Sequence, residues 1–333
     1  MTRHPTSGSE PLLSVQDLRV TFARRGQEPF HAVDGVSFDV RPGQTVGLVG
    51  ESGCGKSVTS LAVMGLLPDR GNTVEGRAVF DGEDLLALSP LAMRDRRGAD
   101  IAMIFQDPLS SLNPVVTIGR QVTEVMERHQ GLSRREATPK AAELLDRVGI
   151  PDPKARLVNY PHQLSGGMRQ RALIAMALAC SPRLLIADEP TTALDVTIQA
   201  QILALLKELV VDTGTALVMI THDLGVVAGL CDEVNVLYGG KIVERGERHG
   251  LFRQPRHPYT TGLLDSIPRL DAERGEKLSP VPGSVADNLP WTSACAFAPR
   301  CSRRLDTCTS HTPQWDGDHV VGYRCFNPTG GAQ

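Results

Sequence analysis

The sequence predicts an α/β fold built on a largely parallel β-sheet that is covered by helices. Short apolar segments with strand character alternate along the chain with segments of helical periodicity, which is the pattern of a covered parallel sheet. One apolar segment, residues 45–49, runs directly into a glycine-rich loop, and a helical segment follows that loop. A strand, a glycine-rich loop and a helix in this order are typical of a phosphate-binding unit.

Length and composition indicate one large domain with a smaller appendage. The chain has 333 residues, of which 41% are hydrophobic and 22% charged, as in ordinary globular proteins. Its net charge of −3 and the lack of a sizeable lysine or arginine cluster argue against a nucleic-acid partner. The longest apolar run, residues 172–180, is shorter than the ~20 residues of a membrane span. Residues 1–11 have no apolar core of a secretory signal, so we expect a cytosolic protein unless a partner holds it at a membrane.

The first part of the chain is expected to begin with antiparallel strands. Apolar and polar residues roughly alternate at residues 13–20 and 33–40, as in half-buried strands. Residues 45–49 are mostly apolar and short, which predicts a buried strand. Residues 57–67 then predict a helix that ends before a proline.

The middle of the chain is expected to be mostly helical. Residues 117–129 and 134–148 show helical spacing. Strand character returns at residues 184–187 and 216–220. The segment between these two strands carries one apolar helical face, formed by Ile198, Ile202, Leu205, Leu206 and Leu209.

The last part of the chain differs in composition. Near Arg253 the sequence becomes rich in proline and loses its periodicity. We place a domain boundary at about residue 250 and expect residues 251–333 to form a small, loop-rich extension with too little apolar sequence to fold well unaided. Residues 1–11 are expected to be a disordered tail.

The glycine-rich loop fits the pattern G-x-x-x-x-G-K-S at residues 50–57. Its glycines let successive backbone N–H groups turn inward around a phosphate. The lysine supplies a cation to the terminal phosphates, and the following serine offers a hydroxyl to Mg²⁺. The candidate nucleotide-binding residues are Gly50, Ser52, Gly53, Cys54, Gly55, Lys56 and Ser57.

Two carboxylates follow the apolar strand at residues 184–187. Asp188 is suited to lie beside Mg²⁺, and Glu189 to polarise an attacking water, because phosphoryl transfer depends on positioning and charge stabilisation. Taken alone, the pair also fits a plain strand terminus. The phosphate-binding loop elsewhere in the chain favours the catalytic interpretation.

A Leu-Ser-Gly-Gly-Met segment at residues 164–168 opens a helical segment. The free N–H groups and positive dipole end of a helix N-terminus suit a phosphate. Ser165 by itself also fits an ordinary N-cap.

Together these segments resemble the ATPase subunit of ABC transporters over about residues 12–250. The resemblance implies a P-loop NTPase fold of the ABC type, with a RecA-like core, an antiparallel β subdomain and a helical subdomain at about residues 112–180. It assigns residues 50–57 to Walker A, Gln106 to the Q-loop, residues 164–168 to the signature, Asp188 and Glu189 to Walker B, residues 193–195 to the D-loop, and His222 to the switch histidine. Phe22 takes the place of the aromatic that stacks on adenine, although Phe30 could serve instead.

The resemblance also implies a mechanism. Two such subunits sandwich two ATP molecules head to tail, each site combining the Walker motifs of one subunit with Ser165, Gly166 and Gly167 of the other. Glu189 would act as general base and His222 would contact the γ-phosphate. Mg²⁺ would be held through Ser57, Gln106 and Asp188, and Gln106 would pass changes at the metal to membrane subunits.

Several stretches resemble the dipeptide and oligopeptide importer ATPases in particular. Met168 replaces the glutamine usual in the broader ABC signature and is typical of the "D" type of two paired ATPases. The resemblance implies an identical or homologous second ATPase, two membrane permease subunits and an extracytoplasmic solute-binding protein. It places the chain peripherally on the cytoplasmic face of the cell membrane. The stretches that carry it are residues 105–114, 164–171, 175–178, 187–201 and 257–260.

Four late cysteines have the spacing C-x5-C-x6-C-x16-C, namely Cys295, Cys301, Cys308 and Cys325. Four thiolates from a loop-rich segment can hold an iron–sulfur cluster or a zinc ion. Zinc sites usually use close C-x2–4-C pairs, which are lacking among these four cysteines, and incidental thiols or disulfides are the third alternative. The family resemblance favours a 4Fe–4S cluster with a structural role. Cys54 is expected to be a small residue of the phosphate loop, with oxidative inhibition through a lowered thiol pKa as a minor alternative.

Other functions fit the sequence less well. Import of nickel or another small solute is the near alternative, because those ATPases share nearly all these motifs. A soluble ABC ATPase that acts on DNA or ribosomes predicts a long coiled-coil insertion or tandem ATPase domains, and a redox protein predicts a flavin or second-cluster motif. Neither pattern is present in the sequence.

Overall fold

The computed structural model describes residues 10–24, 26, 28–192, 194–267, 281–285 and 294–330. These residues belong to two compact units. The helix-rich unit contains residues 41–44 and 88–218, and the strand-rich unit contains residues 10–40, 45–87 and the described residues from 219 onward. The chain passes from the helix-rich to the strand-rich unit within β8 (Ala216–Thr221).

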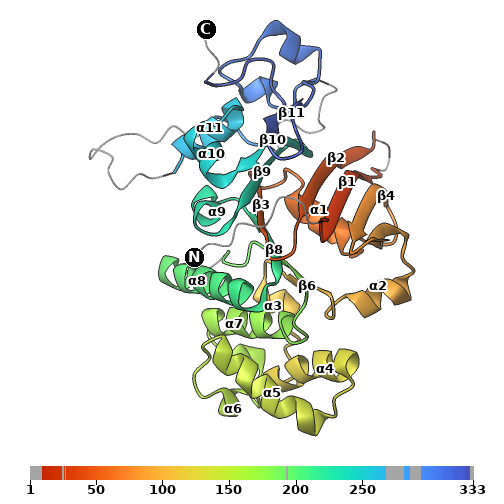
Figure 1. The fold of residues 1–333 in the computed structure, drawn as a ribbon, viewed down its shortest axis with the longest axis vertical. Coiled ribbons are helices and arrows are strands. Elements are labelled where there is room, and N and C mark those ends of the chain that lie inside the picture. The colour runs from red at the N-terminus through yellow and green to blue at the C-terminus, as the bar shows by residue number, and fades with distance from the viewer. Residues whose placement is uncertain are drawn as a thin grey trace. The chain divides into compact units, whose positions relative to one another are not determined.

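An antiparallel sheet at the start of the strand-rich unit confirms the first two predicted strands. Its order is β2-β1-β4-β5 (Figure 1). The alternation along β1 shifts between Val15 and Leu18, where the pairing with β2 is irregular. Both side chains nevertheless remain buried, because a bulge restores the inward direction after an extra residue. The strands are β1 (Leu13–Phe22), β2 (Phe30–Val40), β4 (Asn72–Phe80) and β5 (Glu83–Asp84).

A second group of strands in the same unit carries the glycine-rich loop. β3 (Thr45–Val49) pairs in parallel with β9 (Glu233–Tyr238), and all residues of both are buried. β10 (Lys241–Glu247) then pairs antiparallel with β9. Two short strands from the C-terminal region, β12 (Gly322–Tyr323) and β11 (Asp316–Gly317), continue the sheet beyond β10. The C-terminal region therefore joins the sheet that leads into the loop.

The helices of the strand-rich unit surround these strands. α9 packs on β3, and α10 packs on β9 and β10. α1 follows the glycine-rich loop directly and contacts β1 and β2. The helices are α1 (Lys56–Val63), α9 (Leu224–Leu230), α10 (Arg248–Arg253) and α11 (Pro258–Asp265).

The helix-rich unit is a cluster of helices packed beside a parallel strand pair (Figure 1). β6 (Ile101–Ile104) and β7 (Leu184–Asp188) pair in parallel, and all of β7 is buried. α4, α5 and α7 pack against one another, and α7 also contacts β6 and α8. The helices are α2 (Pro90–Arg96), α3 (Pro108–Ser111), α4 (Ile118–Gln130), α5 (Arg134–Arg147), α6 (Pro153–Arg156), α7 (Gly166–Ala177) and α8 (Val196–Thr213).

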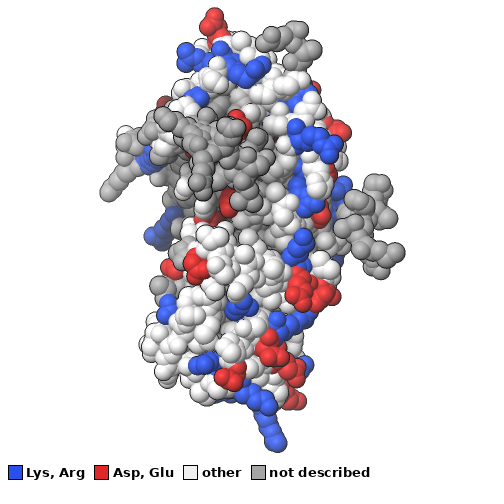
Figure 2. Space-filling view, turned by 90° about the vertical axis from the view of Figure 1, so that its left-hand side faces the viewer, with Lys and Arg blue, Asp and Glu red and all other residues white. Residues whose placement is uncertain are grey.

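The predicted apolar face of the α8 segment is only partly buried. Ile202, Leu206 and Leu209 are buried, whereas Ile198 and Leu205 are partly exposed. None of the helices in the described ranges combines the length and the hydrophobicity that a membrane span requires. Figure 2 shows lysines and arginines interspersed with aspartates and glutamates on the face that it draws.

Candidate functional site

The glycine-rich loop connects β3 to α1 through a backbone that only glycine tolerates at one critical point. Gly55 caps α1 with φ 107°, in the left-handed half of conformational space that favours glycine. A Cβ atom there would lie 2.5 Å from the carbonyl oxygen of Ala32. The sequence therefore needs glycine directly before Lys56, and α1 begins with its first N–H groups at the loop.

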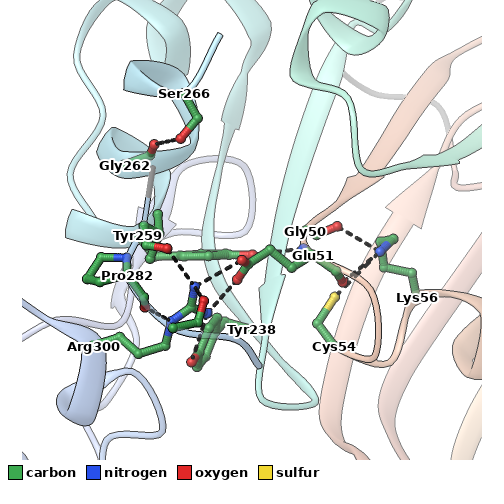
Figure 3. A network of polar contacts seen from close by, with 12 residues as sticks. Gly50, Glu51, Cys54, Lys56, Tyr238, Tyr259, Gly262, Ser266, Pro282 and Arg300 are labelled. Carbon is green, nitrogen blue, oxygen red and sulfur yellow. Dashed lines mark hydrogen bonds and ion pairs between the residues drawn. The ribbon is translucent and has the colours of Figure 1, made fainter. Parts of the chain in front are cut away.

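Lys56 is buried and folded back over its own loop (Figure 3). Its Nζ donates hydrogen bonds to the carbonyl oxygens of Gly50 (2.7 Å) and Glu51 (2.9 Å). Ser52 and Gly53 are exposed at the tip of the loop. The ammonium group is thus held at the loop by two neutral oxygens, which anionic phosphate oxygens can replace with a stronger charge-assisted contact.

The environment of Cys54 contradicts the minor alternative for this residue, a thiol with a lowered pKa. Its thiol is fully buried, and burial raises its pKa despite the nearby Lys56 ammonium group at 3.8 Å. The alternative of a lowered thiol pKa is wrong, because desolvation outweighs the lowering effects of the Lys56 ammonium group and of the Lys56 backbone N–H at the start of α1. Cys54 is a small packing residue of the loop.

In the helix-rich unit, Gln106 and Glu189 are brought together although 83 positions separate them. Gln106 Nε2 donates to Glu189 Oε2 at 3.0 Å, and Thr192 Oγ1 donates to the same oxygen at 2.8 Å. Glu189 follows the buried strand β7, of which Asp188 is the last residue and is 5% exposed. The carboxylate of Glu189 is therefore oriented by two donors.

The signature segment forms the start of α7. Ser165 is the N-cap, and its Oγ accepts a hydrogen bond from the Met168 backbone N–H at 3.3 Å. Gly167 lies so close to α8 that a Cβ atom would be 2.9 Å from Ile198 Cγ2. The capping expected of an isolated serine is present, and a role toward the nucleotide of another subunit stays a prediction. Ala193 of the predicted D-loop lies outside the described residues.

The two candidate aromatics, Phe22 and Phe30, are directly opposite each other on β1 and β2. Phe30 also lies under the Arg24 guanidinium group, 4.6 Å from the ring centroid. His222 directly follows β8 and is exposed. Asp223, the next residue, caps α9 by accepting from the Gly225 N–H at 2.7 Å. His222 therefore lies in a two-residue connection between the end of β8 and the capped start of α9.

The four late cysteines belong to one loop-rich segment and influence one another. Burial raises the pKa of Cys325 to about 11, and each of the other three thiols adds to that rise. The Leu305 N–H donates to Cys308 Sγ at 3.5 Å, and the Asn327 N–H donates to Cys325 Sγ at 3.3 Å. Within the described ranges, no group of three or more His, Cys, Asp or Glu side chains is arranged as a metal site. The sulfurs are within electrostatic reach of one another without forming a closed ligand set.

The structure also shows a contact set that the sequence did not predict. Glu51, inside the phosphate loop, is held by Tyr259 of α11 and by Arg300 of the cysteine-bearing segment (Figure 3). The only sequence signal was the His-Pro-Tyr-Thr stretch at residues 257–260, which carries part of the resemblance to the peptide importer ATPases but does not indicate a contact with Glu51.

A buried strand, a phosphate-shaped loop and a helix that starts at the loop lysine define a P-loop nucleotide-binding protein of the α/β class. A family model described as "ABC transporter" matches residues 33–192, and one described as "Oligopeptide/dipeptide transporter, C-terminal region" matches residues 243–308. The chain belongs to the ABC transporter family and carries this C-terminal region.

Named relatives cover nearly the whole chain. The dipeptide transport ATP-binding protein DppD of Bacillus subtilis (strain 168) is 54% identical over 90% of this chain and 89% of its own length. The oligopeptide transport ATP-binding protein OppD of Escherichia coli (strain K12) is 49% identical over 96% of this chain and 94% of its own length.

Solved structures agree on the fold. The ATP-binding cassette MJ0796, in a dimeric post-hydrolysis state bound to ADP and Pi, is 28% identical, with a TM-score of 0.64 over 71% of this chain and 98% of that chain. CbiO1 from Clostridium perfringens is 27% identical, with a TM-score of 0.60 over 74% of this chain and 92% of that chain. The fold is that of an ABC ATPase.

Proposed function

We propose that this chain is an ATP-hydrolysing subunit that powers the import of dipeptides or oligopeptides through a membrane ABC transporter. The observation that carries the proposal is the similarity to dipeptide and oligopeptide transport ATP-binding proteins across both the ATPase region and the C-terminal region. The proposed domain extents are residues 12–250 for the ATPase, with a helical subdomain at about 112–180, and residues 251–333 for the extension.

The strand-rich unit supplies the phosphate-binding groups of the proposed site. The N–H groups of the loop and of the first turn of α1 bind the phosphates, and Lys56 exchanges its bonds to Gly50 and Glu51 for bonds to phosphate oxygens. Ser57 offers its hydroxyl to Mg²⁺. Phe22 stacks on adenine, and His222 contacts the γ-phosphate.

The helix-rich unit supplies the hydrolytic groups. Glu189 accepts a proton from the attacking water, and the hydrogen bonds that Gln106 and Thr192 donate to its Oε2 atom hold the carboxylate in one orientation. Asp188, held on a fully buried strand, would be a ligand for Mg²⁺ together with Gln106 and Ser57. When bound, Mg²⁺ would neutralise charge on the phosphates.

The proposed site is completed by a second ATPase subunit. Ser165, Gly166 and Gly167 at the start of α7 present helix N–H groups for the ATP held by the partner. Two permease subunits and an extracytoplasmic solute-binding protein complete the proposed importer, with the chain on the cytoplasmic face of the membrane. The dimeric form of the related cassette MJ0796 supports the paired arrangement.

The test of the hydrolytic role is the variant Glu189→Gln. It removes the proposed base and leaves the loop contacts of Lys56 untouched, so ATP binding should be retained while turnover falls by ~100-fold or more. ATPase rates and ATP affinity are measured on the same preparation. Turnover within tenfold of the wild-type rate would contradict the role of Glu189.

We further propose that Cys295, Cys301, Cys308 and Cys325 hold a 4Fe–4S cluster. Their number, the electrostatic proximity of all four sulfurs and the backbone N–H donors at two of them are compatible with cysteine ligands of such a cluster. Bound iron and sulfide would cross-link a segment whose described part is built from short turns, so the proposed role is structural.

Metal analysis of protein purified without oxygen tests this assignment. We expect about four iron atoms and four acid-labile sulfides per chain, the composition of a 4Fe–4S cluster, and loss of both in the Cys308→Ser variant. Cys180→Ser, a change outside the segment, is the matched control and should keep the iron. Stoichiometric zinc without sulfide would replace the cluster by a zinc site.

A further inference from the structure

Glu51 places a carboxylate inside a loop that is proposed to bind a triphosphate. Its side chain is 30% exposed. Like charges at short range repel, and the repulsion grows as water is excluded. An uncompensated Glu51 would therefore oppose binding of the anionic ligand that the rest of the loop is shaped to hold.

Arg300 compensates this charge directly (Figure 3). Its Nη1 and Nη2 atoms donate to the two carboxylate oxygens of Glu51 at 2.5 and 2.9 Å. The arginine side chain is only 4% exposed. Paired, parallel N–H···O bonds of this kind are the strong and geometrically specific form of a salt bridge.

Arg300 is itself rigidly held. Nε donates to the Pro282 carbonyl at 2.7 Å, and Nη2 donates to the carbonyls of Val281 (3.2 Å) and Gly283 (3.0 Å). Nη1 also reaches the Tyr238 hydroxyl at 3.5 Å. The guanidinium group has partners on every side, so it presents its fork to Glu51 in one orientation.

A second group from the C-terminal region holds the backbone of the same residue. The hydroxyl of Tyr259 accepts the Glu51 N–H at 2.8 Å. The Tyr259 ring packs against Tyr238 and Phe297, with centroid distances of 4.7 and 5.3 Å. Phe297 lies three positions before Arg300 in the cysteine-bearing segment. Side chain and backbone of Glu51 are therefore both anchored to the C-terminal region.

Glu51 in turn touches the loop lysine, because its carbonyl accepts a hydrogen bond from Lys56 Nζ at 2.9 Å. We propose that Arg300 is a positioning residue for nucleotide binding, which neutralises Glu51 and holds the phosphate loop in shape, so that the cysteine-bearing segment tunes ATP affinity. This inference rests on the proposed ATPase function. It gives the C-terminal region a role at the nucleotide site besides any role at the membrane subunits.

The test compares nucleotide affinity in the full chain and in Arg300→Met. We expect the Kd for ATP to rise about tenfold, equal to about 1.4 kcal/mol, and the Kd for ADP to rise less, because ADP carries less negative charge. KM for ATP should rise while kcat changes little, since Arg300 does not contact the hydrolytic groups described above. Arg303→Met is the matched control: Arg303 donates to Asn327 and Pro328 within the same segment and should leave both affinities unchanged.

The variant Glu51→Gln distinguishes the loss of charge compensation at Glu51 from a folding defect caused by Arg300→Met. The double variant Glu51→Gln/Arg300→Met should recover ATP affinity to within about threefold of wild type, because removal of both charges is milder than removal of one.

If Arg300→Met does not fold, Glu51→Gln alone is measured, and it should bind ATP at least as tightly as wild type. Three results would each overturn the inference. The first is unchanged ATP affinity in Arg300→Met, and the second is an equal loss of ATP and ADP affinity that the double variant does not recover. The third is weakened ATP binding in Glu51→Gln. A wild-type chain that binds no ATP would instead refute the proposed function.

Discussion

Glu189 adopts a backbone conformation that non-glycine residues rarely take. Its φ of 45° lies in the left-handed region, which costs on the order of 1–3 kcal/mol when the surroundings must enforce it. The residue is 9% exposed, and two donors fix one of its carboxylate oxygens. Strain combined with a fixed carboxylate is the arrangement expected of a preorganised general base.

Thr192 allows the orientation of this carboxylate to be tested without removing it. In Thr192→Val, the hydroxyl that donates to Glu189 Oε2 at 2.8 Å is lost at nearly constant volume. One hydrogen bond to a charged group is worth ~1.5–3 kcal/mol, so kcat for ATP hydrolysis should fall by roughly tenfold while the Kd for ATP stays constant. Thr192→Ser keeps the hydroxyl and should retain most of the rate. Equal rates in the valine and wild-type proteins would show that Gln106 orients Glu189 alone.

Two glycines of the phosphate loop allow a steric clash to be distinguished from the cost of a positive φ angle. Gly55 and Gly53 both have positive φ, 107° and 83°. A Cβ atom at Gly55 would lie 2.5 Å from a carbonyl oxygen, whereas nothing lies within 4 Å of a Cβ atom at Gly53. Gly53→Ala should therefore lower the free energy of unfolding by about 1 kcal/mol, the cost of the left-handed conformation, and Gly55→Ala by clearly more. Urea unfolding of the two variants measures the difference, and equal losses would contradict the steric argument.

At the scale of elements, the sequence predicted a continuous apolar strand before a glycine-rich loop, but it did not predict a strand with polar residues at its centre. β3 was predicted at residues 45–49 and has those bounds, because a short buried strand before a glycine loop has one clear interpretation. β4 was not predicted, since its exposed central residues Glu75, Gly76 and Arg77 interrupt the apolar pattern. β4 forms because it pairs with β1 over its whole length, and such pairing is not visible in a local window.

The start of α11 depends on a histidine that stays neutral. His257 is 1% exposed, and its Nδ1 accepts the Tyr259 N–H at 3.1 Å as the N-cap of the helix. Burial lowers its pKa to about 3. An accepting Nδ1 requires the neutral ring with its proton on Nε2, so the cap and the lowered pKa describe the same state.

This depressed pKa predicts a loss of stability in acid. In the unfolded chain the histidine has its ordinary pKa of about 6.5, so between about pH 6.5 and 3 the unfolded state binds a proton that the native state does not. Stability therefore falls as the pH decreases through this window, by up to ~1.4 kcal/mol per pH unit from this group. His257→Asn keeps a capping oxygen and should show a shallower pH dependence of the unfolding free energy. The raised pKa of Glu244, caused by burial, acts in the opposite direction in both proteins and largely cancels in the comparison.

At the scale of the whole molecule, the contacts between distant segments are what sequence reasoning could not supply. Glu51 and Arg300 are 249 positions apart, and each alone is an ordinary surface charge by pattern. Motif order assigned Gln106 and Glu189, but not that they share a hydrogen bond, nor that Thr192 joins them. Local periodicity carries no information on such pairs. The Glu51–Arg300 pair arises only once the phosphate loop and the cysteine-bearing segment pack together, and the Gln106–Glu189 pair only once β6 and β7 pair.

The motifs proposed to bind and hydrolyse ATP occur in each compact unit, so we expect each unit to respond to nucleotide. Ligand binding stabilises every element whose opening would release the ligand, by ~2.7 kcal/mol at a concentration 100 times Kd. In Glu189→Gln with ATP and Mg²⁺, amide hydrogen exchange should slow at α1 in the strand-rich unit and at β7 in the helix-rich unit. Lys56→Ala, which removes the cation of the phosphate loop, should abolish both effects under the same conditions. Protection confined to α1 would mean that the loop binds nucleotide without the hydrolytic residues of the other unit, because a ligand can slow exchange only in elements whose opening costs it contacts.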